Sequence, residues 1–249
     1  MSQKDWWNAR FKNDGSMIRG DFYAKMDAKV ALTDKVWISE WSGFDKHITS
    51  RIGGGQPKPT LLDLGCGLGQ LAKYFDGLGF DVTAADFSEN ALEVLWSHSP
   101  HIRTLVHDMT NPLPFGDGSF NVVVANLTLH YFCERDTRSI VSEVMRVLKP
   151  NGLLVGAVVS SQDYEKVKDR GCFVEIEPGF YHEVFNDTKK HIRFFSRDDI
   201  DKFFGGFEKL YLDNKFEQRM GKSKGAWEFV FRKQIYVDNK RFVSNGELT

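Results

Sequence analysis

Three glycines at alternate positions, Gly65, Gly67 and Gly69, directly follow an apolar run at 61–64. An apolar run that ends in glycines is typical of a buried strand that turns into a helix. Glycine lets the backbone turn sharply, and without a Cβ its amide stays open to close approach by a ligand. The free N–H groups at the start of the following helix would point to the same place. The pattern predicts a binding loop for a nucleotide-like cofactor, and an ordinary turn is the alternative.

The spacing of these glycines separates two classes of cofactor. A dinucleotide-binding fingerprint has a small residue at the sixth position from the first glycine, where this chain has Gln70. With Asp63 two places before the first glycine, the segment instead resembles motif I of the class I S-adenosylmethionine-dependent methyltransferases, in the branch with methyltransferase domains of type 11/25. The resemblance implies S-adenosyl-L-methionine as cofactor and S-adenosyl-L-homocysteine as its product. In this loop it implies cofactor contacts from Asp63, Gly65, Cys66, Gly67 and Gly69.

A second acidic residue, Asp86, ends the next predicted strand at 80–86. A carboxylate at the end of that strand can accept hydrogen bonds from both ribose hydroxyls of an adenosine. The resemblance places Asp86 and its neighbour Phe87 beside the cofactor, and the alternative is an Asp that merely starts a turn. Ser88 has the position of an N-cap for the helix that follows.

Two later segments carry further features typical of the family. Asp108 and Met109 follow a third apolar run, and the resemblance implies that they hold the adenine. The stretch 113–124 resembles the loop and fourth strand of the branch that methylates small molecules, although Asn121 stands where an acid is usual. We expect that difference to change local hydrogen bonding and to leave the chemistry intact.

The resemblance to this family implies an α/β fold: a Rossmann-like, seven-stranded, mostly parallel sheet with helices on both faces. Stretches 208–216 and 226–232 alternate in polarity as strands do, and the resemblance implies that they form the last antiparallel pair of that sheet. Ser196 with Asp199 predicts a capping box for a helix that reaches Phe204. At 249 residues, 41% of them hydrophobic, the chain is long enough to bury a full core.

The glycine- and proline-rich stretch at 53–59 marks a boundary in the chain. We predict an N-terminal helical cap or lid at 1–52, the S-adenosylmethionine-binding domain at 53–233 and a C-terminal tail at 234–249. Within the domain, an insert at 160–197 is expected to shape the acceptor pocket, as the corresponding region does in the family.

Adjacent tryptophans, Trp6 and Trp7, are unusual so close to a chain end, which normally stays wet and mobile. We expect both indoles to be buried against the rest of the protein. In similar enzymes such a segment closes over the cofactor, and this would bring Arg10, Arg19 and Tyr23 to the cofactor carboxylate or to the acceptor. The alternative is a helix that docks on the core with the tryptophans at its seam.

Residues after the fourth strand are expected at the acceptor site, because open α/β sheets bind ligands at the carboxyl ends of their strands. Asn126 and Leu127 are assigned to the cofactor there. His130 and Tyr131 follow, and His130 is the candidate for a general base or an acceptor contact, with a structural role as the alternative. Tyr181, in the aromatic insert, is expected either in the acceptor pocket or in the core of the insert.

The net charge of the chain indicates which kinds of binding partner to expect. Lys and Arg total 33 against 34 acids, and the net charge of −1 gives no overall attraction to nucleic acid or to an anionic membrane. We therefore expect a small-molecule acceptor that is methylated on N, O or S. Methylation of a tRNA base or a protein is a rival. Its local basic residues would be Lys189, Lys190, Arg193, Arg219, Lys222 and Lys224.

Two further rivals are a non-catalytic, methyltransferase-like subunit and a nicotinamide enzyme, which the glycine spacing disfavours. His182 and His191 lack the spacing and the partners of a metal site, so no metal is expected. Three dispersed cysteines do not form a disulfide framework, the N-terminus has no apolar leader, and no run reaches membrane-spanning length. We expect a cytoplasmic enzyme, and the acceptor and the oligomeric state stay open.

Overall fold

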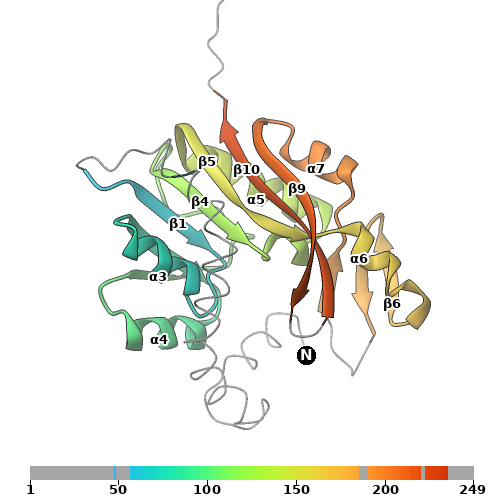
Figure 1. Cartoon of the computed structure of the whole chain (residues 1–249). Coiled ribbons are helices and arrows are strands. Elements are labelled where there is room, and N and C mark those ends of the chain that lie inside the picture. Colours follow the sequence, from blue (N-terminus) through green and yellow to red (C-terminus); the bar gives the residue numbers. More distant parts are fainter. Residues whose placement is uncertain (1–47, 49–56, 185–189, 220–221, 235–249) are drawn as a thin grey trace, which may run out of the picture.

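The structure, a computed structural model, describes residue 48 and residues 57–184, 190–219 and 222–234 (Figure 1). Apart from Ile48 and Gln234, the predicted cap at 1–52 and the predicted tail at 234–249 lie outside the described residues. The described part centres on one large sheet with helices against both of its faces (Figure 1).

The large sheet has seven strands in the order β3-β2-β1-β4-β5-β10-β9. In that order the strands are β3 (Arg103–Val106), β2 (Asp81–Asp86), β1 (Thr60–Leu64), β4 (Phe120–Asn126), β5 (Leu148–Val159), β10 (Lys222–Lys233) and β9 (Phe207–Arg219). Strands β1 to β5 pair in parallel, and β10 runs antiparallel to both β5 and β9. The predicted seven-stranded sheet and its last antiparallel pair are confirmed, and the pair is longer than predicted.

Neighbouring residues of a strand point to opposite faces of the sheet, and this divides the core in two. The longer helices are α3 (Gln70–Gly77), α4 (Glu89–His98), α5 (Glu134–Val147) and α7 (Arg197–Phe204). Leu62 and Val123 pack in one hydrophobic cluster with α5 and α7. Leu61 and Val122 pack in the other with α3 and α4, and Ile48 is buried there too. Helices therefore cover both faces, as predicted.

Helix starts follow the expected capping residues. The Ser88 side chain accepts a hydrogen bond from the backbone N–H of Ala91 at the start of α4. Ser196 and Asp199 form the predicted capping box, each side chain accepting from the other residue's backbone N–H. A side-chain cap of this kind stabilises a helix by about 1 kcal/mol.

Asn121 changes local hydrogen bonding, as the sequence indicates. Its Oδ1 accepts from the backbone N–H of Thr60 at 3.0 Å and from Lys149 Nζ at 2.9 Å. The side chain thus ties the start of β1 to β4 and to the entry of β5, at the edge of the sheet opposite the strand ends where ligands bind.

The insert leaves the large sheet after β5 and returns beside it. It contains α6 (Ser161–Glu165), η2 (Lys168–Arg170) and a small antiparallel sheet of β6 (Phe173–Glu177), β7 (Phe180–Glu183) and β8 (Lys190–Arg193). At its exit, Phe195 N donates to Val159 O at 2.8 Å, and Ser161 N donates to Phe195 O at 2.8 Å. The entry and exit of the insert are therefore neighbours at the carboxyl end of β5.

Candidate active site

Strand order reverses between β1 and β4, and ligands of open α/β sheets bind at such a reversal. The glycine loop lies there, with φ of 76° at Gly65, 54° at Gly67 and 76° at Gly69. The backbone N–H groups of Gly65 and Cys66 both donate to Ala85 O, at 2.8 and 3.1 Å. The loop is thereby fastened to the end of β2.

Two of the glycines are required by the packing of the protein itself. A Cβ on Gly65 would lie 2.4 Å from Thr128 Oγ1, and a Cβ on Gly69 would lie 2.5 Å from Leu95 Cδ1. The expectation that these glycines keep amides open to a ligand is therefore incomplete. Their left-handed backbone and the side chains against them already disfavour any other residue.

Asp86 joins the loop to the strand end. Its Oδ2 accepts a hydrogen bond from the backbone N–H of Gly67 at 2.9 Å, and its Oδ1 accepts one from the backbone N–H of Ser88 at 2.9 Å. Burial raises the pKa of Asp86, while the hydrogen bonds from Ser88, Gly67 and Phe87 oppose the rise. A carboxylate has about four lone-pair sites, so these hydrogen bonds leave capacity for a further one from the ribose that the sequence assigns to Asp86.

Asp63 is the most deeply buried acid of the site, with 2% of its surface exposed. Burial raises the pKa of Asp63 most and the charge of Asp86 raises it further, to about 7. A backbone hydrogen bond from Ala72 acts in the opposite direction and lowers it. Within the described part of the chain, Asp63 Oδ2 has no hydrogen-bond partner. Two neighbouring buried carboxylates favour a ligand that carries positive charge, and S-adenosylmethionine meets that requirement.

Other residues assigned to the cofactor lie around the loop. Burial raises the pKa of the Cys66 thiol, and so do the charges of Asp63 and Asp86. Met109 is buried, and its Cε lies 3.1 Å from the position of a Cβ on Gly65, so its side chain packs on the loop. Asp108 accepts from Thr110 Oγ1 at 2.7 Å and from Thr110 N at 3.1 Å, which closes the turn after β3.

The fourth strand ends in an uncommon backbone conformation. Asn126 is the last residue of β4, and Leu127 has a φ of 52°. A left-handed Leu is strained, and such strain is found preferentially at functional sites. The Leu127 N–H donates to Ala157 O at 2.8 Å, which fixes the turn against β5. His130 and Tyr131 follow in η1 (Leu129–Tyr131), with ring centroids 4.1 Å apart.

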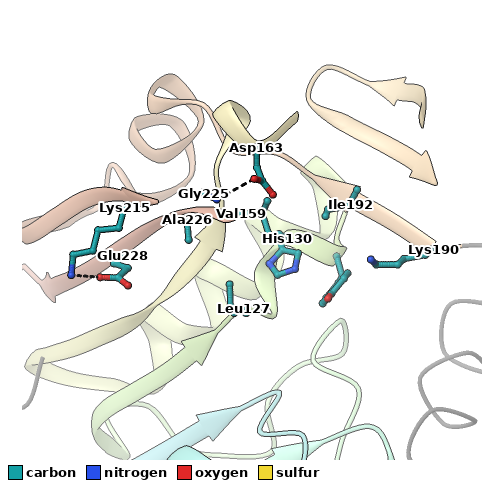
Figure 2. Close-up of a pocket in the computed structure, with 11 residues that line it drawn as sticks. Leu127, His130, Val159, Asp163, Lys190, Ile192, Lys215, Gly225, Ala226 and Glu228 are labelled. Atoms are coloured by element: carbon teal, nitrogen blue, oxygen red, sulfur yellow. Dashed lines mark hydrogen bonds and ion pairs between the residues drawn. The ribbon is translucent and has the colours of Figure 1, made fainter. Parts of the chain in front are cut away.

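Beside this turn lies a cavity of about 150 Å³ (Figure 2). It is lined by Leu127, His130, Tyr131, Val159, Asp163, Lys190, Ile192, Lys215, Gly225, Ala226 and Glu228. His130 is buried, and its ring lies among the side chains that line the cavity. It comes from the same turn as Leu127. The cavity thus adjoins the carboxyl ends of β4 and β5.

The lining has four charged residues that were not assigned to the acceptor pocket from the sequence: Asp163, Lys190, Lys215 and Glu228. Lys190 was named only as a basic residue for the rival tRNA or protein acceptor. Lys215 Nζ lies 2.7 Å from Glu228 Oε2. Burial lowers the pKa of Lys215, but the hydrogen bond with Glu228 outweighs this effect, and the pKa is raised. Asp163 Oδ1 accepts from Gly225 N at 3.1 Å, and Lys190 pairs with Glu183. Glu228 is the one acid in a stretch, 226–231, whose other residues are apolar. That pattern is the sequence signal that could have indicated a functional role for Glu228.

Tyr181 does not line the cavity. Its ring stacks on Tyr164, with centroids 4.3 Å apart, and packs with Ile192 and Phe194 in the core of the insert. Of the two positions expected for Tyr181, the structure therefore favours the core of the insert over the acceptor pocket. The expected lid residues Trp6, Trp7, Arg10, Arg19 and Tyr23 lie outside the described residues.

Arg193 is not the surface residue that an RNA-binding patch requires. It is fully buried, and its guanidinium pairs with Glu177 and lies 5.2 Å from the centroid of the Phe203 ring. Lys189 is outside the described residues, and nothing is described of the side chains of Arg219, Lys222 and Lys224. Among the described residues, no group of three or more His, Cys, Asp or Glu side chains is arranged to hold a metal ion.

The strand order, the edge pair and a glycine loop between two buried acids are typical of the Rossmann-like fold of S-adenosylmethionine-dependent methyltransferases. Residues 62–156 match the family model described as a methyltransferase domain. This match confirms, for residues 62–156, the resemblance seen in the sequence.

Known proteins of similar sequence extend beyond that segment. The malonyl-acyl-carrier-protein O-methyltransferase of Buchnera aphidicola is 31% identical over 155 residues, which cover 62% of this chain and 57% of that protein. The mitochondrial arginine-hydroxylase NDUFAF5 of Homo sapiens is 29% identical over 195 residues, covering 68% of this chain and 52% of that protein. The chain therefore spans little more than half the length of these relatives.

A solved structure of an S-adenosylmethionine-dependent methyltransferase from Methanosarcina mazei has the same fold. Its TM-score to this chain is 0.64 at 20% identity, and the match covers 73% of this chain and 95% of the other. Within the described residues, no helix is both long and apolar enough to cross a membrane.

Proposed function

We propose that the protein transfers the methyl group of S-adenosylmethionine to a nitrogen, oxygen or sulfur atom of a small-molecule acceptor in the cytoplasm. One observation carries the proposal: the turn after β4 lies against the glycine loop through Thr128 and lines a cavity of about 150 Å³ through Leu127 and His130. A methyl transfer needs both sites side by side, because donor and acceptor must align in a dry place.

The cofactor site is assigned to residues of the loop and of three strand ends. When bound, S-adenosylmethionine supplies an electrophilic methyl group on a positively charged sulfur. Asp86 accepts from the ribose hydroxyls, and Asp63 offers a negative charge to the cationic part of the ligand. Around them, the cofactor-binding residues are Gly65, Cys66, Gly67, Gly69, Phe87, Asp108, Met109, Asn126 and Leu127.

His130 is assigned to the acceptor. It lines the cavity from the turn after β4, where it can remove a proton from an amine or a hydroxyl, or donate a hydrogen bond to the acceptor. Tyr131 lies against it and provides a second polar group. A thiol acceptor that is already ionised needs no base, and His130 then only orients it.

The test has two steps. Calorimetry with S-adenosylhomocysteine measures whether the purified protein binds the cofactor product, and incubation with methyl-labelled S-adenosylmethionine and fractionated cell extract identifies the methylated molecule. Label in a small molecule supports the proposal, whereas label in tRNA or protein supports the corresponding rival. Tight binding without any turnover would support a non-catalytic subunit.

A hydroxylation is the second candidate, because the longer of the two reported alignments is with a protein named as an arginine hydroxylase. The same extract experiment separates the two reactions by mass spectrometry. A product heavier by one methylene group indicates methyl transfer, and a product heavier by one oxygen atom indicates hydroxylation.

A further inference from the structure

The charged side chains that line the cavity after β4 and β5 already have partners. Lys215 Nζ lies 2.7 Å from Glu228 Oε2, and both residues belong to the lining (Figure 2). Glu228 is buried, with 5% of its surface exposed. This pair places opposite charges side by side on one wall, so a ligand there meets a positive and a negative charge together.

The other two charged residues of the lining are paired as well. Lys190 Nζ lies 3.1 Å from Glu183 Oε2, and Glu183 is not part of the lining. Asp163 Oδ1 accepts a hydrogen bond from the backbone N–H of Gly225 at 3.1 Å, and Lys166 Nζ lies 3.9 Å from the same oxygen. The lysines and acids of the lining therefore balance, and each is engaged within the protein.

The rest of the cavity is largely apolar. Leu127, Val159, Ile192 and Ala226 contribute to the lining, and the cavity measures about 150 Å³. An apolar cavity of about that volume accommodates a single benzene ring. Moving an ion from water into such a space is unfavourable unless an opposite charge is available to pair with it. An ionic ligand would have to separate an existing pair, whereas an uncharged ligand leaves every pair intact.

We propose that the acceptor is an uncharged molecule whose reacting part has about the size of one ring. The inference rests on the proposed function, because it takes this cavity as the acceptor site. Charges that are already paired admit a neutral molecule and discriminate against its anionic and cationic counterparts. A protonated amine is unsuitable for a second reason, since its nitrogen has no lone pair that could attack a methyl group. Neutral hydroxyl, thiol and ring-nitrogen acceptors meet the requirement.

The methyl transfer balances for a neutral acceptor. A lone pair of the acceptor atom forms the bond to the methyl carbon, and the bond from that carbon to the sulfonium sulfur breaks with its electron pair left on sulfur. Where the acceptor atom carries a proton, as in a hydroxyl group, the proton passes to His130, which lines the cavity. The acceptor therefore does not have to enter the cavity as an anion.

The test uses three probes built on one ring: benzyl alcohol as the neutral molecule, benzylamine as the cation and benzoate as the anion. Each is titrated at millimolar concentration into the full-length protein saturated with S-adenosylhomocysteine, and binding is followed by NMR. Benzyl alcohol is expected to bind about tenfold or more tightly than either ion, because a buried charged group without a partner is strongly disfavoured. A charged probe that binds as tightly as benzyl alcohol, or no binding by any probe, would overturn the inference.

Two variants each break one pair and should admit the ion of matching charge. Glu183→Gln leaves Lys190 without its acid and changes no residue of the lining, so the affinity for benzoate should rise about tenfold. Lys215→Gln leaves Glu228 without its lysine, so the affinity for benzylamine should rise by about the same factor. Neither variant should gain affinity for benzyl alcohol. Unchanged affinity for the ions in the folded variants would contradict the proposal.

The matched control is Glu208→Gln, because Glu208 pairs with Arg232 outside the cavity. It should keep the preference of the wild-type protein. Normal S-adenosylhomocysteine binding by a variant shows that it is folded. Glu183 and Lys190 are partly exposed, so Glu183→Gln still tests the proposal if Lys215→Gln does not fold.

Cofactor binding separates this inference from the proposed function. If S-adenosylhomocysteine does not bind to the wild-type protein, the proposed function fails and the inference fails with it. If it binds normally and the probes show no preference for the neutral molecule, the inference alone fails.

Discussion

Asp63 and Asp86 are both buried at the glycine loop, but their oxygens have different surroundings. Asp86 accepts hydrogen bonds from two backbone amides that belong to different segments, so it also holds the loop in place. Asp63 lies close enough to Asp86 for the charge of Asp86 to raise its pKa, and its Oδ2 has no hydrogen-bond partner among the described residues. A substitution at either position should therefore change cofactor binding, each for its own reason.

Asp86→Ala should weaken binding of S-adenosylhomocysteine by about 1.5–3 kcal/mol, the range for hydrogen bonds to a charged group. Calorimetry measures the change. Asp81→Ala, at the other end of β2, is the matched control, because Asp81 pairs with Arg103 at the surface. Unchanged affinity in a folded Asp86→Ala variant would show that the carboxylate does not contact the cofactor.

Asp63 predicts a pH dependence of the free protein. Its pKa is about 7 when folded and about 4 when unfolded, so between these values the folded protein keeps a proton that the unfolded chain has released. The stability contributed by this group is present below about pH 4 and is lost as the pH rises to about 7. Asp63→Asn should remove this loss, as urea unfolding at a series of pH values would show.

The same titration should act on ligand binding in the opposite direction. Ionised Asp63 favours a cationic ligand, so the affinity for S-adenosylmethionine should rise as the pH passes through about 7. In the Asp63→Asn variant the rise should be absent. An identical pH profile in variant and wild type would mean that another group is responsible.

At the scale of elements, the glycine loop is fixed from several directions. Backbone hydrogen bonds tie it to the end of β2, Thr128 lies against it from the turn after β4, and Leu95 lies against it from α4. These contacts come from three different elements. The loop, which we propose as the cofactor-binding loop, is thus also a junction of the fold.

Gly69→Ala should destabilise the protein by about 1–3 kcal/mol, because it combines a strained left-handed backbone with a clash on Leu95. Leu95→Ala removes the clash and leaves the backbone strain. In urea unfolding the double variant should therefore lose less stability than the two single variants together. Strict additivity would show that Leu95 does not limit this position.

Patterns of neighbouring residues predicted most of the helices and strands. The contacts that they did not predict depend on strand register and on packing between distant segments. The glycine loop, the capping box and the alternating strands depend on residues close in sequence, which is why they could be read from it. Lys215 and Glu228 meet only because β9 and β10 pair in a particular register, which places Ala226 opposite Lys215. The stacking of Tyr181 on Tyr164 also depends on tertiary packing, so a pocket role and a core role could not be separated beforehand.

At the scale of the whole molecule, the proposed N-terminal lid stays a prediction. If Trp6 and Trp7 close over the cofactor, deletion of residues 1–12 should leave the melting temperature unchanged and abolish most methyl transfer, because water enters the site. If they are core residues, the truncated protein should melt much earlier, since truncating one buried Trp to Ala costs about 3–5 kcal/mol. Proteolysis with and without S-adenosylhomocysteine is an independent measurement, and equal cleavage rates would contradict a lid.

The insert enters and leaves the large sheet at one point, where Phe195 returns to hydrogen-bond Val159. Its two ends are already joined by the sheet, so its length and sequence can change without altering the strand order or the glycine loop. Lys190 and Asp163, however, belong to the insert, while Glu228 and His130 belong to the large sheet. Exchange of this single segment between homologous chains is therefore a modular route by which evolution or an engineer can alter part of the proposed acceptor cavity and keep the rest intact.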